Sequence, residues 1–131
     1  MKNVHIPADK KVTEGAIATY WIEDGILVSL SKPTRRSVAL IAENVELVKN
    51  VTGGKPAPLL IYLTNSPVPD KPTRQFSTEK LPEIYKAMAM VSKPGLAQLI
   101  MNLLFKFKAP AIPMKSFTSA QEAREWLQQF I

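Results

Sequence analysis

The 131-residue chain contains no cysteine and a single histidine, His5. Without cysteine there are no disulfides, no thiol catalysis and no thiolate metal site, and this composition fits a reducing compartment, so we expect a cytoplasmic protein. One histidine cannot build a multi-histidine metal centre. We therefore expect neither a metal ion nor another cofactor.

Long apolar runs are also missing. The N-terminal segment has no apolar core of the kind that a secretory signal needs, and no stretch approaches the ~20 apolar residues of a membrane helix. The phosphate-binding patterns G-x-x-x-x-G-K and G-x-G-x-x-G do not occur, and we find no serine and aspartate set that His5 would complete to a hydrolytic triad. The sequence therefore predicts a protein that is not an enzyme and has no membrane span.

Positive charge is present and unevenly distributed. The formal net charge is +6, and residues 71–118, with eight basic and two acidic residues, carry an excess of the same size. A basic excess permits a phosphate-rich partner without demanding one. Lys106 and Lys108 are also explained as cations near the negative end of a helix dipole. Because no RNA-binding signature such as GXXG is present, we do not expect nucleic acid as the partner.

The apolar pattern predicts an α/β domain that begins with an antiparallel hairpin. Residues 16–31 contain two strands that flank Asp24-Gly25, a favoured two-residue type I′ turn. Residues 1–14 form a lead-in, and residues 15–131 form one domain. Ser119 and Glu122 make an S-x-x-E capping box before the last helix.

The remaining elements alternate between helix and strand. We expect a helix over 34–52, a buried strand over 58–64, a short or broken helix over 73–85 that Pro82 interrupts, a buried strand over 86–93, a helix over 95–107, a short edge strand over 112–117 and a helix over 120–131. The complete order is β-β-α-β-α-β-α-β-α. Right-handed crossovers between the later strands would make those strands parallel, in a mixed sheet.

Three stretches in the second half of the chain resemble a known family. They are AMAMVSK, the helix end NLLFKFKAP and the closing IPMKSFTSAQEAREWLQQF. With the order of elements, they are similar to the STAS domain, and more closely to small bacterial SpoIIAA-like proteins of unassigned function. The resemblance covers about residues 15–131. It implies a SpoIIAA-like mixed sheet with helices, and it implies no known activity.

In STAS antagonists, an Asp-Ser-Ser/Thr-Gly-like motif after the central strand carries the hydroxyl that an anti-sigma kinase phosphorylates. The comparable place here reads Thr64-Asn65-Ser66-Pro67, which makes Ser66 the analogue of the phosphosite. No acidic residue directly precedes this segment and no glycine follows it. Pro67 also lacks the backbone N–H that could bind a phosphate.

The loop after LLIYL is the first candidate site, because ligands of open α/β sheets bind beyond the carboxyl ends of the strands. Its candidate contact residues are Thr64, Asn65, Ser66, Asp70, Lys71 and Arg74. The alternative is a connecting loop whose asparagine and serine side chains bond to their own backbone.

The expected helix over 95–107 is the second candidate. Only Gln98, Asn102 and Lys106 interrupt its apolar surface, which is wider than the apolar stripe of an ordinary surface helix. The apolar interface or pocket residues are Leu96, Leu99, Ile100, Leu103, Leu104 and Phe107. Three alternatives could bury these residues: a neighbouring helix, a second copy of the chain in a homodimer, or an apolar, lipid-like ligand.

Arg35 and Arg36 form a third candidate at the start of the first expected helix. Two cations there oppose the helix dipole, and an anion that bridges them to the free N–H groups would relieve this. The alternative is a pair of solvated side chains. Taken together, the sequence predicts a non-enzymatic regulatory module that acts through protein contacts, as a homodimer or with another protein. The alternative is a carrier or sensor of a small apolar or amphipathic ligand in a pocket beside helix 95–107.

Overall fold

The computed structural model describes residues 6–104 and 110–131, and for residues 103 and 104 only the backbone. Its strands form one six-stranded sheet in the order β1-β2-β3-β4-β5-β6. Strands β1 to β3 are antiparallel, and β3 to β6 are parallel. The mixed α/β sheet predicted from the sequence is therefore confirmed.

The strands are β1 (Thr13–Glu14), β2 (Ala18–Glu23), β3 (Ile26–Ser31), β4 (Ala57–Tyr62), β5 (Tyr85–Val91) and β6 (Met114–Phe117). The helices are α1 (Val38–Thr52), α2 (Lys71–Ile84), α3 (Leu96–Leu104) and α4 (Ala120–Leu127), and a short 3-10 helix over Gln128–Phe130 follows. No helix within the described ranges is both long enough and apolar enough to span a bilayer.

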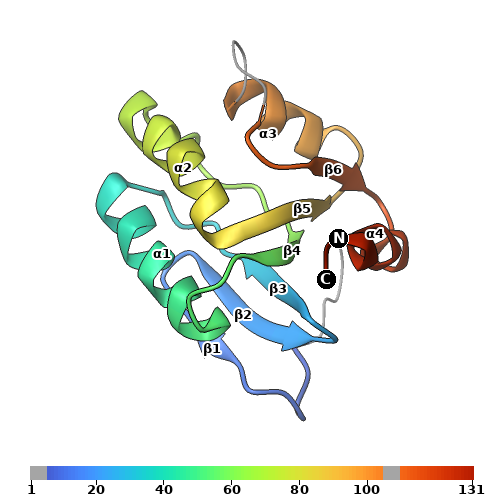
Figure 1. The fold of residues 1–131 in the computed structure, drawn as a ribbon. Coiled ribbons are helices and arrows are strands. Elements are labelled where there is room, and N and C mark those ends of the chain that lie inside the picture. Colours follow the sequence, from blue (N-terminus) through green and yellow to red (C-terminus); the bar gives the residue numbers. More distant parts are fainter. Residues whose placement is uncertain (1–5, 105–109) are drawn as a thin grey trace.

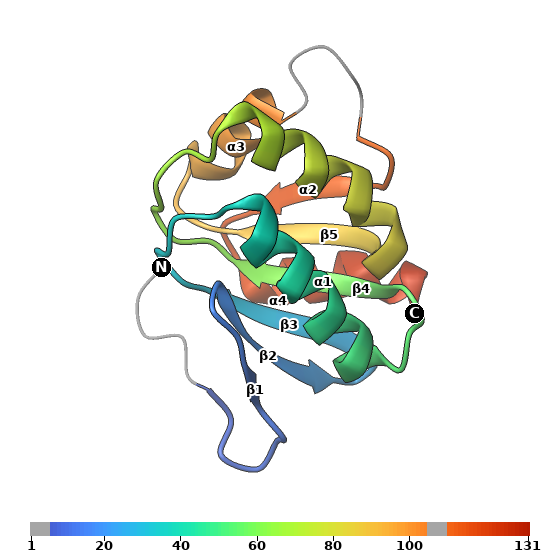
Figure 2. The same ribbon diagram turned by 90° about the vertical axis from the view of Figure 1, so that its left-hand side faces the viewer.

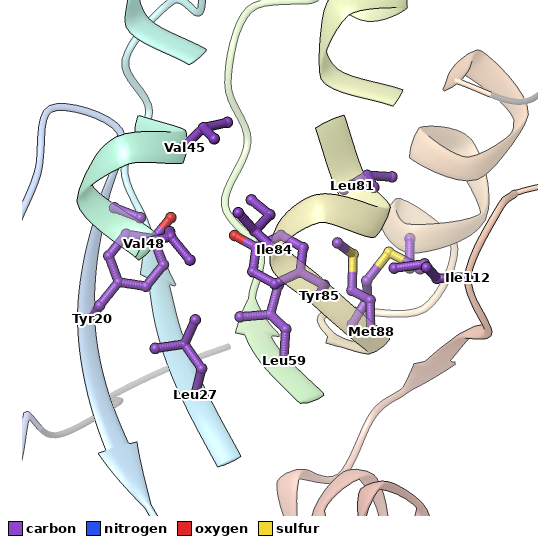
Figure 3. Close-up of a cluster of buried hydrophobic side chains, with 13 residues drawn as sticks. Tyr20, Leu27, Val45, Val48, Leu59, Leu81, Ile84, Tyr85, Met88 and Ile112 are labelled. Carbon is purple, nitrogen blue, oxygen red and sulfur yellow. The ribbon is translucent and has the colours of Figure 1, made fainter. Parts of the chain in front are cut away.

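Helices α1, α2 and α3 cover one face of the sheet, and α4 covers the other (Figures 1 and 2). The core beneath α1 and α2 includes Tyr20, Val48, Leu59 and Met88 (Figure 3). The core beneath α4 is a second cluster, which includes Trp21 of the sheet and Leu127 of the helix. The sheet is thus the central layer of three.

The first hairpin has the predicted turn. Asp24 has a φ of 50° and Gly25 a φ of 82°, both in the left-handed region that a type I′ turn requires. Glu23 pairs with Ile26 across this turn. One strand lies where the sequence predicted only a lead-in, because Thr13–Glu14 pairs with β2 at the edge of the sheet.

Helix α1 begins later than the sequence predicted. Its N-cap is Ser37, whose hydroxyl accepts a 3.2 Å hydrogen bond from the backbone nitrogen of Leu40. The expected start at residue 34 was therefore wrong, and Arg35 and Arg36 precede the helix. The C-terminal stop at Gly53, with a φ of 73°, is the predicted one.

Helix α2 is continuous, so the prediction of a short or broken helix was wrong. Asp70 caps its start and accepts a 3.0 Å hydrogen bond from the backbone nitrogen of Thr73. Pro72 lies in the first turn, where backbone N–H groups have no acceptor within the helix, so the missing N–H of proline costs no hydrogen bond. Pro82 lies only two residues before the helix ends at Ile84. The backbone hydrogen bond that Pro82 cannot donate is therefore lost in the last turn, and the rest of α2 is unaffected.

Strand β5 contains a register shift that turns one side chain over. Tyr85 pairs with Ala57, but Ala87 pairs with the next residue, Pro58, so Lys86 is an extra residue. As a result Tyr85 lies in the core beneath α1 and α2, whereas Ala87 lies in the core beneath α4.

The later elements follow the prediction in type and order. Pro113 directly precedes β6, which is an edge strand, as expected for a proline at a strand start. Ser119 caps α4 and accepts a hydrogen bond from the backbone nitrogen of Glu122. Helix α3 is described to Leu104, and the end of the predicted helix at residue 107 falls outside the described residues.

Candidate functional site

A cavity of about 220 Å³ lies between the sheet and helices α1 and α2, and we call it the central cavity. Strands β2 and β3 with α1 and its lead-in supply a polar wall, which consists of Tyr20, Ser29, Ser31, Arg36 and Asn44. Strands β4 and β5 with α2 supply an apolar wall, which includes Leu59, Ile61, Leu81, Ile84, Met88 and Met90. Further polar residues line the cavity on the α2 side, among them Thr73, Ser77 and Lys80, and apolar ones such as Ile41 and Val45 line it on the α1 side, so the central cavity is amphipathic.

Three buried side-chain polar atoms in the described part of the chain have no hydrogen-bond partner: Ser29 Oγ, Asn44 Oδ1 and Thr64 Oγ1. All three residues line the central cavity. Ser29 is completely buried. Since buried polar groups in native proteins are almost always paired with protein, water or a ligand, these atoms mark the cavity as the candidate site.

The polar wall follows from the pleat of the sheet. Ser29 and Ser31 are two residues apart in β3 and so point to the same face. Ser29 lies opposite Tyr20 of β2, and Ser31 lies opposite Ala18. The hydroxyl groups of Ser29, Ser31 and Tyr20 therefore lie on the face of the sheet that helices α1 and α2 cover.

Two tyrosines approach each other over the cavity. The side-chain nitrogen of Asn44 donates a 2.8 Å hydrogen bond to the Tyr20 hydroxyl oxygen. Burial raises the pKa of Tyr20, although the bond from Asn44 opposes this. Burial also raises the pKa of Tyr85 well above its ordinary value, and the neighbouring Tyr20 adds to this shift. Figure 3 shows the two phenol oxygens directed toward one another. Both phenols therefore stay protonated at neutral pH.

Arg36 holds the polar wall to the start of α1. Its two terminal nitrogens donate to the carbonyl oxygens of Lys32, Thr34 and Ile17 and to the hydroxyl oxygen of Ser31. Burial lowers the pKa of Arg36. These four bonds give Arg36 a structural role. Arg35, the other half of the predicted anion site, is exposed.

The loop predicted as a ligand site contributes half of its candidates to the cavity. Thr64, Ser66 and Arg74 line it, with Ser66 exposed at the rim. Arg74 donates a 2.7 Å hydrogen bond to the carbonyl oxygen of Pro69. The other three candidates are not lining residues: Asn65, Asp70 and Lys71 are exposed, and Asp70 is committed to capping α2.

The predicted apolar helix contributes less. Ile100 lines the central cavity and Leu96 is half-buried, whereas Leu99 has 64% of its surface exposed. The polar stripe is present, because Gln98 donates a 2.9 Å hydrogen bond to Asn102. The side chains of Leu103, Leu104 and Phe107 lie outside the described residues.

Two further hollows lack the features of the central cavity. One, between α1 and the β1 region, is lined largely by exposed side chains such as Glu43 and Glu46. The other lies at the start of α3, where the Ser92 hydroxyl already donates to the Lys93 carbonyl oxygen. Within residues 6–104 and 110–131 there is also no group of three or more histidine, aspartate or glutamate side chains that could hold a metal ion.

The sequence contained one unused signal for this site. Serine occurs twice at a spacing of two residues in ILVSLS, a strand that is otherwise apolar. In a strand covered on both faces, such a pair marks a polar patch on one face. The contribution of Tyr85 had no such signal, because it depends on the register shift.

The architecture and the cavity define an α/β protein with a SpoIIAA-like fold. Its fold matches the crystal structure of an uncharacterized DUF3478-family protein from Shewanella loihica PV-4, which has a SpoIIAA-like fold, with a TM-score of 0.53 and 14% sequence identity. The match covers 90% of this chain and 91% of that chain. The predicted fold is thus confirmed.

The chain belongs to the DUF7793 family, a domain of unknown function, whose sequence profile matches residues 20–131. No curated protein matches the sequence. These similarities establish the fold and the family, and they name no reaction.

Proposed function

We propose that this protein is a non-enzymatic binding module whose central cavity takes up a small amphipathic ligand, as a sensor or carrier. The observation that carries the proposal is that all three described residues with an unpartnered buried polar atom are lining residues of one cavity. An apolar wall faces them. A few convergent polar groups in a mainly apolar pocket are typical of ligand sites.

The size of the cavity limits the ligand. Its volume is about 220 Å³. An apolar cavity of ~150 Å³ holds benzene, and drug-sized ligands occupy ~300 Å³ or more. The ligand is accordingly a molecule somewhat larger than benzene. The lipid-like ligand that the sequence left open as an alternative is thereby narrowed to a short-chain molecule.

Native mass spectrometry of gently purified protein tests this function. We expect an adduct, or a thermal shift when a library of small amphiphiles is added, and a loss of either in a variant that fills the cavity. Ile61→Phe adds bulk to the apolar wall from a half-buried position, and Ile22→Phe adds the same bulk at an exposed position on β2 as the control. A library without a single binder, together with no adduct, contradicts the proposal.

A second function, contact with a protein, is favoured by one observation. Leu99 is 64% exposed on α3, a helix in which seven of the nine residues are apolar, and a helix that is apolar around most of its circumference is usually covered on more than one side. The proposed contact is a homodimer or a complex with another protein. Light scattering of the wild type and of Leu99→Gln tests it: a dimer that the substitution dissociates is expected, and a wild-type monomer at all concentrations contradicts the homodimer.

A further inference from the structure

The charges around the central cavity have one sign. Among the residues that the structure describes, the cations Arg36, Arg74 and Lys80 line it, and no aspartate or glutamate does so. A cleft lined by one sign of charge with apolar walls concentrates the opposite charge. An anionic head on the ligand would match this field, whereas an ammonium head would oppose it.

Of the three cations, Arg36 in the polar wall has the fewest nearby carboxylates to balance its charge. Lys80 is paired with Glu83 at 3.1 Å, and Arg74 lies near enough to Asp70 to affect the pKa of that carboxyl group. Arg36 is partly buried, and its four acceptors are three carbonyl oxygens and one hydroxyl. No ion pair within the described ranges includes it. A partly buried cation of this kind is stabilised by an anion brought into the same cavity.

The hydroxyl groups beside Arg36 are suited to donate. Ser29 Oγ makes no hydrogen bond of good geometry, although it lies near enough to the Tyr20 hydroxyl to lower the pKa of Tyr20. Ser31 Oγ accepts a bond from Arg36, so the hydrogen of Ser31 is free. Both serines are buried. The unpartnered acceptor of the same wall, Asn44 Oδ1, lies toward the backbone of Gly15, 3.7 Å from the position of an added Cβ there. The donors are thus the groups available to a ligand oxygen.

From these observations we infer that the ligand is a small monocarboxylate with an apolar body. Its carboxylate accepts hydrogen bonds from Ser29 and Ser31 in the field of Arg36, and its body lies against Leu59, Met88 and the rest of the apolar wall. This inference rests on the proposed ligand-binding function and specifies its ligand class. In this inference, Ser29 and Ser31 of β3 form the binding site for the head group of the ligand.

Three probes of equal chain length test it: hexanoate, 1-hexanol and hexylammonium, each titrated into the full chain at neutral pH by calorimetry. Hydrogen bonds to a charged group contribute more than neutral ones, so we expect hexanoate to bind about tenfold more tightly than hexanol or better. Hexylammonium should bind most weakly. Equal binding of hexanol and hexanoate, or tighter binding of hexylammonium, overturns the inference while it leaves the ligand-binding function standing. If no probe binds, the inference fails, and the library of small amphiphiles with native mass spectrometry decides the ligand-binding function separately.

A single substitution distinguishes binding at the head-group site from nonspecific binding. Ser29→Ala should weaken hexanoate binding about tenfold, because one charged hydrogen bond is lost. Ser116→Ala makes the same change at an exposed position of β6 and should leave the affinity unaltered. An unchanged affinity for hexanoate in a folded Ser29→Ala protein contradicts the assignment of Ser29. Circular dichroism establishes that both variants fold.

Discussion

Asn44 of α1 and Tyr20 of β2 are joined by a 2.8 Å hydrogen bond, from the amide nitrogen of Asn44 to the phenol oxygen of Tyr20. The two residues are 24 positions apart in the chain, and their bond fixes the first helix over the polar wall of the central cavity. It also occupies one side of a phenol that is otherwise buried.

Tyr20→Phe should destabilise the protein. The substitution leaves the amide nitrogen of the half-buried Asn44 without its partner, and the loss of one such hydrogen bond costs about 0.5–1.5 kcal/mol. Urea denaturation measures the change in the free energy of unfolding. Asn44→Ala in the same background removes the stranded donor, so the double variant should lose less than the sum of the single variants. Strict additivity would show that the bond does not couple α1 to β2.

Ser29→Ala should act in the opposite direction on the ligand-free protein. The hydroxyl of Ser29 is buried without a partner, and removal of such a group recovers about 1 kcal/mol of stability. A serine retained for folding alone would lose stability when it is replaced. A lower free energy of unfolding in Ser29→Ala would therefore contradict the account of this residue as a ligand-facing group.

Stability should fall at alkaline pH. Burial raises the folded-state pKa of both Tyr20 and Tyr85 above the ordinary value of 10.0. Below about pH 10 both states keep the phenolic protons, and the stabilisation is fully present. Above it the unfolded chain releases protons that the folded chain retains, so the unfolded state is favoured by up to about 1.4 kcal/mol per pH unit for each phenol.

Urea denaturation at a series of pH values from 8 to 11 measures this slope. The variant with both Tyr20→Phe and Tyr85→Phe is the control, because its remaining titrating groups are the same. Its stability should decline less steeply. Parallel declines in the two proteins would mean that the buried phenols do not cause the loss.

Gly25 should tolerate alanine less well than Gly53 does. Both have positive φ, 82° and 73°, so both substitutions carry the left-handed penalty of about 1–2 kcal/mol. An added Cβ at Gly25 would also lie 3.0 Å from Ile131 Cγ2, whereas at Gly53 it would meet nothing within 4 Å. The extra loss at Gly25, measured by thermal or urea unfolding, should disappear in an Ile131→Ala background. A loss that persists there would place its origin in the turn itself.

The pattern of the sequence predicted most of the fold because the local signals and the tertiary structure agree. Asp24-Gly25 can hardly form anything except a tight turn, and Ser119 with Glu122 marks the start of α4 in sequence and structure alike. Where several signals compete over a few residues, prediction failed. Pro82 suggested a break, but a break of α2 requires a proline far from both ends.

The candidate site was only partly predictable, since it is assembled from distant segments. The rule for parallel strands indicated the loop after β4, and Thr64, Ser66 and Arg74 do line the cavity. The loop rule could not indicate the polar wall, because Ser29 acts together with Arg36 only once the hairpin and the start of α1 meet. Tyr85 points toward α1 and α2 because β5 contains one extra residue. The alternation of apolar and polar residues in the sequence gives no sign of this extra residue.

The order of strands in the sheet follows their order in the chain without exception. Each strand from β3 onward is laid beside the strand synthesised just before it, and no strand has to be inserted between two that are already paired. A nascent chain can therefore extend the sheet at one growing edge, and every described residue that lines the cavity precedes α4 in the chain. Helix α4, whose Ala123 and Leu127 are fully buried, covers the opposite face and follows all six strands in the chain.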